Sequence, residues 1–279
     1  MPKPTITALY PHQHTLGEGA FWHQPSEQLW WVDILQKRIY ASDAAGVHLR
    51  TWNMPELVGF ALPRPDGRFW VGLQSGLHIA DLLDGGESWL ERVDTLAHPD
   101  GEVRFNDACL GPDGSLYAST MAMDAESVLG KIVHYGLDGT HTFIADSFVI
   151  GNGPLWHPQL GLLMVETVGH EGRPKGIYQA QTDSPETNWL AWPWDSSPDG
   201  ISTDGAGHIW VGGYGGHIIR QFSTAGDLLR AVDLPALNPT KVAVHPDGRL
   251  FVTTAGEHVT DEQRAQYPLT GQLLVVEGI

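Results

Sequence analysis

A short phrase recurs six times along the chain: turn residues followed by a strand rich in aromatic and β-branched side chains. It reads EQLWWVD at 27–33, DGRFWVG at 66–72, DGSLYAS at 113–119, LGLLMVE at 160–166, GHIWVGG at 207–213 and DGRLFVT at 247–253. The central large residues of these copies lie 39, 47, 47, 46 and 41 residues apart; they are Trp31, Trp70, Tyr117, Met164, Trp210 and Phe251. A period of about 40–50 residues that holds several short strands is typical of propeller blades. The sequence therefore predicts an all-β fold, a six-bladed β-propeller.

Closure of the ring explains how such short strands can form a stable core. One isolated sheet leaves both faces and edges open to water, whereas radial stacking buries the faces and closure protects the edges. The final strand, within GQLLVVEG, and the N-terminal TITALY are expected to complete the last blade together. No linker or low-complexity segment interrupts the 279 residues. We therefore expect a single domain over 1–279, closed by the strands at its two ends.

The composition restricts the partners and the compartment. The chain has 33 acidic residues against 16 Lys and Arg, a formal charge of −17, so it repels phosphate backbones and anionic lipid. We expect no nucleic-acid partner and no membrane partner. The N-terminus lacks the apolar core of a signal peptide, and the one cysteine, Cys109, cannot form an intrachain disulfide. These features favour a cytoplasmic protein, a monomer or weak oligomer.

A second position of the repeat carries polar residues. The innermost strand of each propeller blade lines the central channel, so equivalent residues of different blades must converge there. The position 11 to 13 residues before each central large residue is occupied by Glu18, Val58, Asn106, Asn152, Asp199 and Thr240. Two carboxylates and two amides in a mostly apolar channel are costly unless they are compensated, and a divalent cation compensates them directly. Oxygen ligands suit Ca²⁺, Mg²⁺, Mn²⁺, Fe²⁺ or Zn²⁺, so the identity of the ion stays open.

Each candidate ligand has a structural alternative. An Asp in a Pro-Asp-Gly triplet is usually a hairpin residue, and the Asp residues at 66, 113 and 247 lie four positions before their central large residues. Asp199 instead lies 11 positions before Trp210, which favours a site role. Glu18 would otherwise be a solvated loop acid, and Asn152 a left-handed turn residue.

Two further residues are candidates for substrate contact. Asn106 is either a direct metal ligand or a residue that contacts water or substrate. Arg104 lies two residues before Asn106 and shares its face by strand alternation. It would donate hydrogen bonds to substrate oxygens if it points into the site. The alternative for Arg104 is a surface position at a strand edge.

Five segments, in this order, resemble the SMP-30/gluconolactonase/regucalcin family of sugar lactonases. They are LGEGAFWH at 16–23, RFNDACLGPDGSLYASTM at 104–121, GNGPLWHP at 151–158, PDGISTDGAGHIWVGGYGG at 198–216 and PTKVAVHPDGRLFVTTA at 239–255. The C-terminal AQYPLTGQLLVVE is similar to bacterial aldonolactonases such as xylonolactonases. The resemblance implies a six-bladed propeller with a metal ion held by Glu18, Asn152 and Asp199. It also implies substrate contacts from Arg104 and Asn106.

The chain departs from this family at one substrate-binding position. Regucalcin-like members carry an acid shortly after the Thr-Met pair, where it contacts sugar hydroxyls. Here the run is TMAMD at 120–124, which places Met123 at that position. Asp124 is a candidate substitute. The departure affects the identity of the substrate more than the type of reaction.

These observations together predict metal-dependent hydrolysis of a small-molecule sugar lactone, an aldonolactone, to the aldonic acid. The ion would polarise the lactone carbonyl, and Asp199 would act as general base. No G-x-S-x-G or H-E-x-x-H motif is present, so neither a serine nucleophile nor a zinc-protease site is expected. Two alternatives remain: a calcium-binding propeller without catalysis, and a promiscuous esterase or phosphotriesterase that uses the same chemistry.

Overall fold

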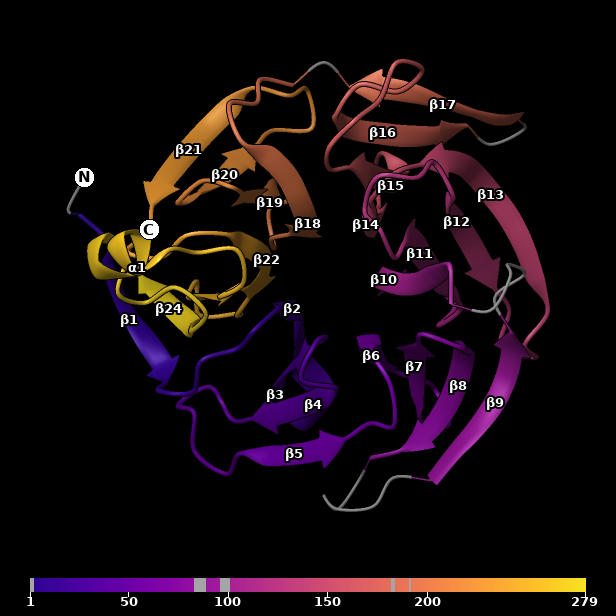
Figure 1. Cartoon of the computed structure of the whole chain (residues 1–279), viewed down its shortest axis with the longest axis horizontal. Helices are drawn as coiled ribbons and strands as arrows, with labels where there is room; N and C mark the ends of the chain where they lie inside the picture. Colours follow the sequence, from indigo (N-terminus) through magenta and orange to yellow (C-terminus); the bar gives the residue numbers. More distant parts are fainter. Residues whose placement is uncertain (1–2, 83–88, 96–100, 182–183, 191) are drawn as a thin grey trace.

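The computed structural model describes residues 3–82, 89–95, 101–181, 184–190 and 192–279. Within these ranges the strands form six four-stranded antiparallel sheets, arranged as blades around a central axis (Figure 1). The first blade consists of β2 (Gly17–His23), β3 (Gln28–Asp33), β4 (Arg38–Ser42) and β5 (Arg50–Asn53), with a short 3₁₀ helix at Gln24–Ser26. The second consists of β6 (Val58–Pro63), β7 (Phe69–Leu73), β8 (Gly76–Asp81) and β9 (Trp89–Thr95). The third consists of β10 (Val103–Leu110), β11 (Leu116–Ala122), β12 (Gly130–Tyr135) and β13 (His141–Phe148).

The remaining blades continue the ring. The fourth consists of β14 (Gly151–His157), β15 (Gly161–Glu166), β16 (Gly176–Gln181) and β17 (Ser184–Leu190). The fifth consists of β18 (Ser197–Thr203), β19 (Ile209–Tyr214), β20 (Ile218–Phe222) and β21 (Leu228–Asp233). The sixth consists of β22 (Pro239–Val244), β23 (Leu250–Thr254), β24 (Leu273–Glu277) and β1 (Thr5–Tyr10). The predicted six-bladed fold is confirmed.

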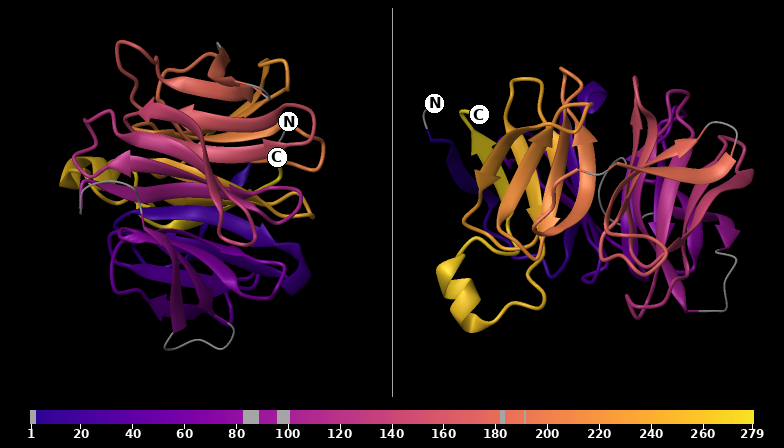
Figure 2. Two further views of the ribbon diagram at one scale, coloured as in Figure 1. Left: turned by 90° about the vertical axis from the view of Figure 1, so that its right-hand side faces the viewer. Right: turned by 90° about the horizontal axis from the view of Figure 1, so that it is seen from above.

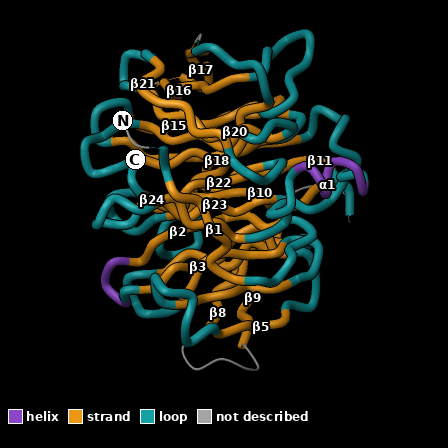
Figure 3. The backbone as a smooth tube through the Cα atoms, turned by 90° about the vertical axis from the view of Figure 1, so that its left-hand side faces the viewer, coloured by secondary structure: helices purple, strands orange, loops and turns teal. Residues whose placement is uncertain are grey.

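Both ends of the chain contribute to the sixth blade. β1 pairs antiparallel with β24, so that Thr5 lies opposite Glu277 and Ala8 opposite Leu274. The two termini consequently lie close together at one side of the ring (Figures 1 and 3). The described α-helix, α1 (Asp261–Gln266), lies between β23 and β24 and projects from the ring (Figure 2). No helix in the described part of the chain is long and apolar enough to span a membrane.

The central large residues of the repeat all lie in the second strand of their blade, as the period predicts. Most of them are almost completely buried and pack against the neighbouring blade. Trp31 packs in a cluster with Phe251 and Val275 of the sixth blade, and Trp70 in a cluster with Leu116 of the third. The core therefore lies between the blades, which explains why a large residue recurs once in each.

The innermost strands, which are β2, β6, β10, β14, β18 and β22, surround the axis (Figure 1). Each of them shifts its register against the second strand near its start. Such a bulge gives the inner strand one extra residue and turns side chains away from strict alternation. The bulges are the feature of the fold that positions the candidate site.

Candidate active site

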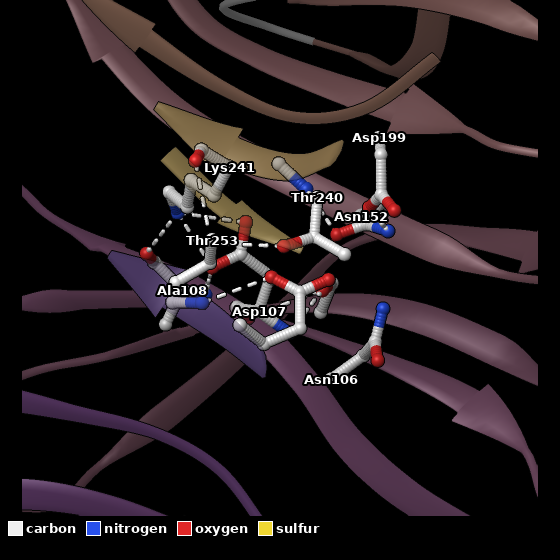
Figure 4. A network of polar contacts seen from close by, with 12 residues as sticks. Asn106, Asp107, Ala108, Asn152, Asp199, Thr240, Lys241 and Thr253 are labelled. Carbon is white, nitrogen blue, oxygen red and sulfur yellow. Dashed lines mark hydrogen bonds and ion pairs between the residues drawn. The ribbon is translucent and has the colours of Figure 1, made fainter. Parts of the chain in front are cut away.

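The polar position identified from the repeat lies at or within the bulge of every inner strand. Its occupants are 0 to 5% exposed, and they are Glu18, Val58, Asn106, Asn152, Asp199 and Thr240. All six inner strands begin at the same mouth of the channel, so these residues meet there. Figure 4 shows Asn106, Asn152 and Asp199 turned towards a common space. Gly19 and Gly153, which follow Glu18 and Asn152, have φ values of 62° and 44°, a region that glycine enters without a steric penalty.

Asn152 and Asp199 are in direct contact. The Asn152 side-chain Nδ2 donates a hydrogen bond to Asp199 Oδ1 and a longer one, 3.4 Å, to Thr167 Oγ1. Its Oδ1 accepts a hydrogen bond of 3.1 Å from the Gly153 amide. The partly positive end of an amide therefore faces the Asp199 carboxylate. Rotation of the amide by 180° would present its oxygen instead.

The two carboxylates at the polar position of the repeat, Glu18 and Asp199, are buried close to further negative charge. Among the described residues, the Glu18 carboxylate accepts one hydrogen bond, 2.9 Å from the Gly19 amide. Burial, and after it the charge of Asp107, raises the pKa of Glu18 to about 8. Burial, and after it the charges of Glu18 and Asp107, raises the pKa of Asp199 well above its ordinary value. Positive charge that enters the site would favour the ionised form of both groups.

A divalent cation fits this donor set. The two carboxylates and the Asn152 amide supply hard oxygen donors, and a cation would offset the burial that raises the pKa of Glu18 and of Asp199. In the described residues no group of three or more His, Cys, Asp or Glu side chains is arranged to hold a metal ion. The candidate set thus combines two acids with an amide and leaves coordination positions free for water and substrate.

Arg104 and Asn106 form the wall of the site contributed by the third blade. Arg104 is 7% exposed, so the surface alternative is wrong. Its Nη1 donates 2.7 Å to Asn106 Oδ1 and 3.0 Å to the Phe105 carbonyl. Asn106 Nδ2 donates 3.0 Å to the Gly151 carbonyl. Because Asn106 Oδ1, the atom that would bind a metal ion, already accepts from Arg104, this geometry disfavours direct metal binding by Asn106.

Met123 and Asp124 lie at the rim, just after β11. Met123 is 40% exposed, and its amide donates 2.8 Å to the Glu102 carbonyl. The Asp124 carboxylate accepts hydrogen bonds from the amides of Glu126 and Ser127 and from the Ser127 hydroxyl. It therefore organises its own turn, which argues against Asp124 as a substitute for the missing acid.

Two other buried acids stand at the second-strand ends near this mouth, and both serve the backbone. The Asp33 carboxylate accepts from the amides of Thr15 (2.8 Å), Leu16 (3.2 Å) and Gln36 (3.0 Å). The Glu166 carboxylate accepts from four amides of the neighbouring loops, those of residues 149, 150, 168 and 169. The Asp33 and Glu166 carboxylates thus serve to hold the backbone of their own loops.

The sequence reasoning missed a buried ion pair next to the residues of the polar position. Lys241 Nζ lies 2.6 and 2.7 Å from the two carboxylate oxygens of Asp107, and the side chains are 9% and 2% exposed (Figure 4). Asp107 directly follows Asn106, and Lys241 directly follows Thr240, so each comes one residue after the polar position of the repeat. Beyond the pair, towards the opposite mouth, lies a mostly apolar cavity of about 260 Å³ with Trp22 and Trp156 in its wall.

It also missed a pair at the rim of the site. The Tyr214 hydroxyl donates 3.4 Å to Glu257 Oε1. Tyr214 ends β19, and Glu257 lies in the loop between β23 and α1. The charge of Glu257 acts on Arg104, as do the charges of Glu18 and Asp199.

Comparison with known proteins supports the fold and the lineage. The pentonolactonase XacC of Haloferax volcanii is 28% identical over 265 residues, covering 90% of this chain and 86% of the relative. The L-arabinolactonase of Azospirillum brasilense is 28% identical over 286 residues, covering 99% and 93%.

A calcium-binding protein named regucalcin from Agrobacterium tumefaciens has the same fold, with a TM-score of 0.86 at 23% identity and coverage of 100% and 96%. The sequence profile of the SMP-30/gluconolactonase/LRE-like region matches residues 16–256. The chain therefore belongs to the SMP-30/gluconolactonase/LRE-like family.

Proposed function

We propose that this protein hydrolyses a sugar lactone, an aldonolactone, to the aldonic acid, with one divalent metal ion held by Glu18, Asn152 and Asp199. The observation that carries the proposal is the meeting of two buried, undercompensated carboxylates and an amide at one mouth of the channel. The relatives named pentonolactonase and L-arabinolactonase support the substrate class.

The residues divide the work by their chemistry. A divalent ion held there would polarise the lactone carbonyl and lower the pKa of a water molecule. Ionised Asp199 accepts a proton from the attacking water as the water oxygen bonds to the carbonyl carbon. The same proton then passes to the ring oxygen as the ester C–O bond breaks, so one water is consumed and one hydroxy acid forms.

Arg104 and Asn106 orient the substrate. Arg104 is buried but keeps donors beyond those bound to Asn106 and Phe105, because a guanidinium carries five N–H groups. These donors suit the hydroxyl and carbonyl oxygens of a lactone. Their contacts are made with bound substrate, so Arg104 acts on substrate affinity rather than on metal affinity.

The test is metal analysis of the purified protein, followed by a pH-indicator assay of pentono- and hexonolactones before and after chelation. Chelation is expected to abolish turnover, and a divalent ion to restore it. Asp199→Asn is expected to lower kcat by about 10²-fold or more, the usual worth of a general base. Asp261→Asn, an exposed acid of α1, is the matched control and keeps wild-type activity. Chelator-resistant activity, or normal turnover by Asp199→Asn, would refute the proposal.

The same assay separates the two alternatives. A calcium-binding propeller without catalysis would bind the ion but release no acid from any lactone. An esterase or phosphotriesterase would show a higher kcat/KM for an aryl ester or phosphotriester than for the sugar lactone. Arg104→Ala is expected to raise KM by about tenfold or more, since a charge-assisted hydrogen bond is lost, with metal content unchanged.

A further inference from the structure

The loop between β23 and α1 is bound to the segment that leads directly into β2, the strand that carries Glu18. Ala255 forms a bridge with Leu16, two residues before Glu18. The amides of Gly256 and Glu257 each donate 3.0 Å to the Thr15 carbonyl. Glu257 therefore has a defined backbone position at the mouth of the channel where the ring residues lie.

The Glu257 side chain is held by a residue from the blade that carries Asp199. Tyr214 pairs with Ser197, two residues before Asp199, and its hydroxyl donates 3.4 Å to Glu257 Oε1. Burial, and after it the charges of Glu257 and Asp199, raises the pKa of Tyr214 above its ordinary value, so the hydroxyl stays a neutral donor. The Glu257 side chain is only 20% exposed, and its second oxygen lies 3.7 Å from the exposed imidazole of His258.

Glu257 and Arg104 stand on opposite sides of the axis. The inner strands contact one another in the ring order β2, β6, β10, β14, β18, β22, so the third and sixth blades face each other. Arg104 belongs to the third and Glu257 to the sixth. Burial lowers the pKa of Arg104, and the charges of nearby acids act in the opposite direction. Among these, the charge of Glu257 has a larger effect than that of Asp199. A ligand bound over Glu18, Asn152 and Asp199 thus has a cationic donor on one side and a carboxylate acceptor on the other.

We propose that Glu257, positioned by Tyr214, determines specificity by accepting hydrogen bonds from the hydroxyl groups of the lactone, opposite Arg104. The proposal rests on the lactonase function proposed above. It explains how a site with Met123 on the Arg104 side still recognises a polyhydroxylated substrate, because the acid stands on the opposite wall. Tyr214 is a positioning residue in this scheme, since it acts through the Glu257 carboxylate.

The test compares two lactones of the same ring size, a pentono-1,4-lactone and the unsubstituted γ-butyrolactone. Glu257→Gln is expected to lower kcat/KM for the pentonolactone by about tenfold or more through KM, the worth of a hydrogen bond to a charged group. It leaves γ-butyrolactone unaffected, measured as turnover or as Ki in competition with the pentonolactone. Tyr214→Phe shifts the same ratio less, and metal content stays at the wild-type level. Glu262→Gln, an exposed acid of α1, is the matched control.

The outcomes distinguish the two proposals. A wild-type protein that hydrolyses no lactone overturns the proposed function. An active wild type whose Glu257→Gln variant keeps its pentonolactone kcat/KM overturns the role of Glu257 alone. Equal losses on both lactones overturn it too, because a general disturbance of the loop would affect an unsubstituted ring as much as a hydroxylated one.

Discussion

Lys241→Met tests the buried ion pair beneath the ring most directly. The change keeps an unbranched side chain of similar length but removes the ammonium that lies 2.6 and 2.7 Å from the Asp107 oxygens. Asp107 is 1% exposed, and of its own backbone contacts the carboxylate keeps the 2.8 Å hydrogen bond from the Ala108 amide. Removal of one partner of a buried pair leaves an uncompensated charge and costs about 3–5 kcal/mol. We expect a loss at the lower end of this range, because that amide remains.

The measurement is urea unfolding followed by tryptophan fluorescence at pH 7, with the free energy taken from linear extrapolation. The double variant Asp107→Asn, Lys241→Met removes both charges and is expected to recover most of the loss. Such a recovery would show that the cost lies in the orphaned carboxylate rather than in the lost packing of Lys241. A loss below about 1 kcal/mol in the single variant, or a double variant as unstable as the single one, would refute the reasoning.

The pair also adjusts the candidate metal ligands. The charge of Lys241 lowers the pKa of Glu18 and of Asp199, whereas the charge of Asp107 raises both. Lys241→Met is therefore expected to strengthen binding of a divalent cation, because loss of the ammonium makes the site more negative and a doubly charged ion gains more from this than a competing proton does. Calorimetric titration with Ca²⁺ or Mn²⁺ at two pH values checks this, since the gain should be larger at the higher pH, where fewer protons compete.

Two further perturbations follow from the geometry. Folded Glu18, whose pKa of about 8 lies above the ordinary value of 4.5, binds more protons between these pH values than the same residue does in the unfolded chain. The melting temperature in chelator should therefore fall as the pH rises through that window, and a divalent ion should stabilise more at the higher pH; a rise in chelator would contradict this. Gly212→Ala places a Cβ 2.4 Å from the Thr240 carbonyl oxygen of the next blade and should cost about 1–3 kcal/mol in urea unfolding. Gly205→Ala, with no atom within 4 Å of the new Cβ, is its control and should stay near wild type; equal effects would refute the packing argument.

The repeat predicted the fold because the packing of a propeller repeats with its sequence. In each blade one large residue of the second strand packs against a neighbouring blade, as Trp31 and Trp70 do. Large residues therefore recur in the sequence at the blade period. The convergence of Glu18, Asn152 and Asp199 followed from the same geometry, because equivalent residues of a closed ring must meet. The Tyr214–Glu257 pair could not be predicted this way. Glu257 lies in a loop beyond the last repeat phrase, and its place depends on the bridge to Leu16.

The Asp107–Lys241 pair escaped prediction because strict alternation turns successive residues of a strand to opposite faces. That rule assigns Asp107 to the face opposite Asn106, but the bulge between Phe105 and Ala108 suspends it. The residue directly after the polar position of the repeat nevertheless shows a pattern in the sequence. It is glycine in four blades, at Gly19, Gly59, Gly153 and Gly200, and it is charged only in the third and sixth.

Those two blades face each other across the ring, and their charges are opposite. Gly200 leaves room for the long side chain of Lys241, which joins the two blades: a Cβ on Gly200 would lie 2.9 to 3.0 Å from the Lys241 stem. The Lys241 side chain therefore needs the space that the absence of a side chain at Gly200 leaves. A side chain introduced at Gly200 should displace Lys241 from Asp107 and mimic the loss of stability of Lys241→Met. Gly205→Ala in the same blade, where the new Cβ meets nothing within 4 Å, provides the comparison. If Gly200→Ala were as stable as that control, Gly200 would have no part in positioning the ion pair.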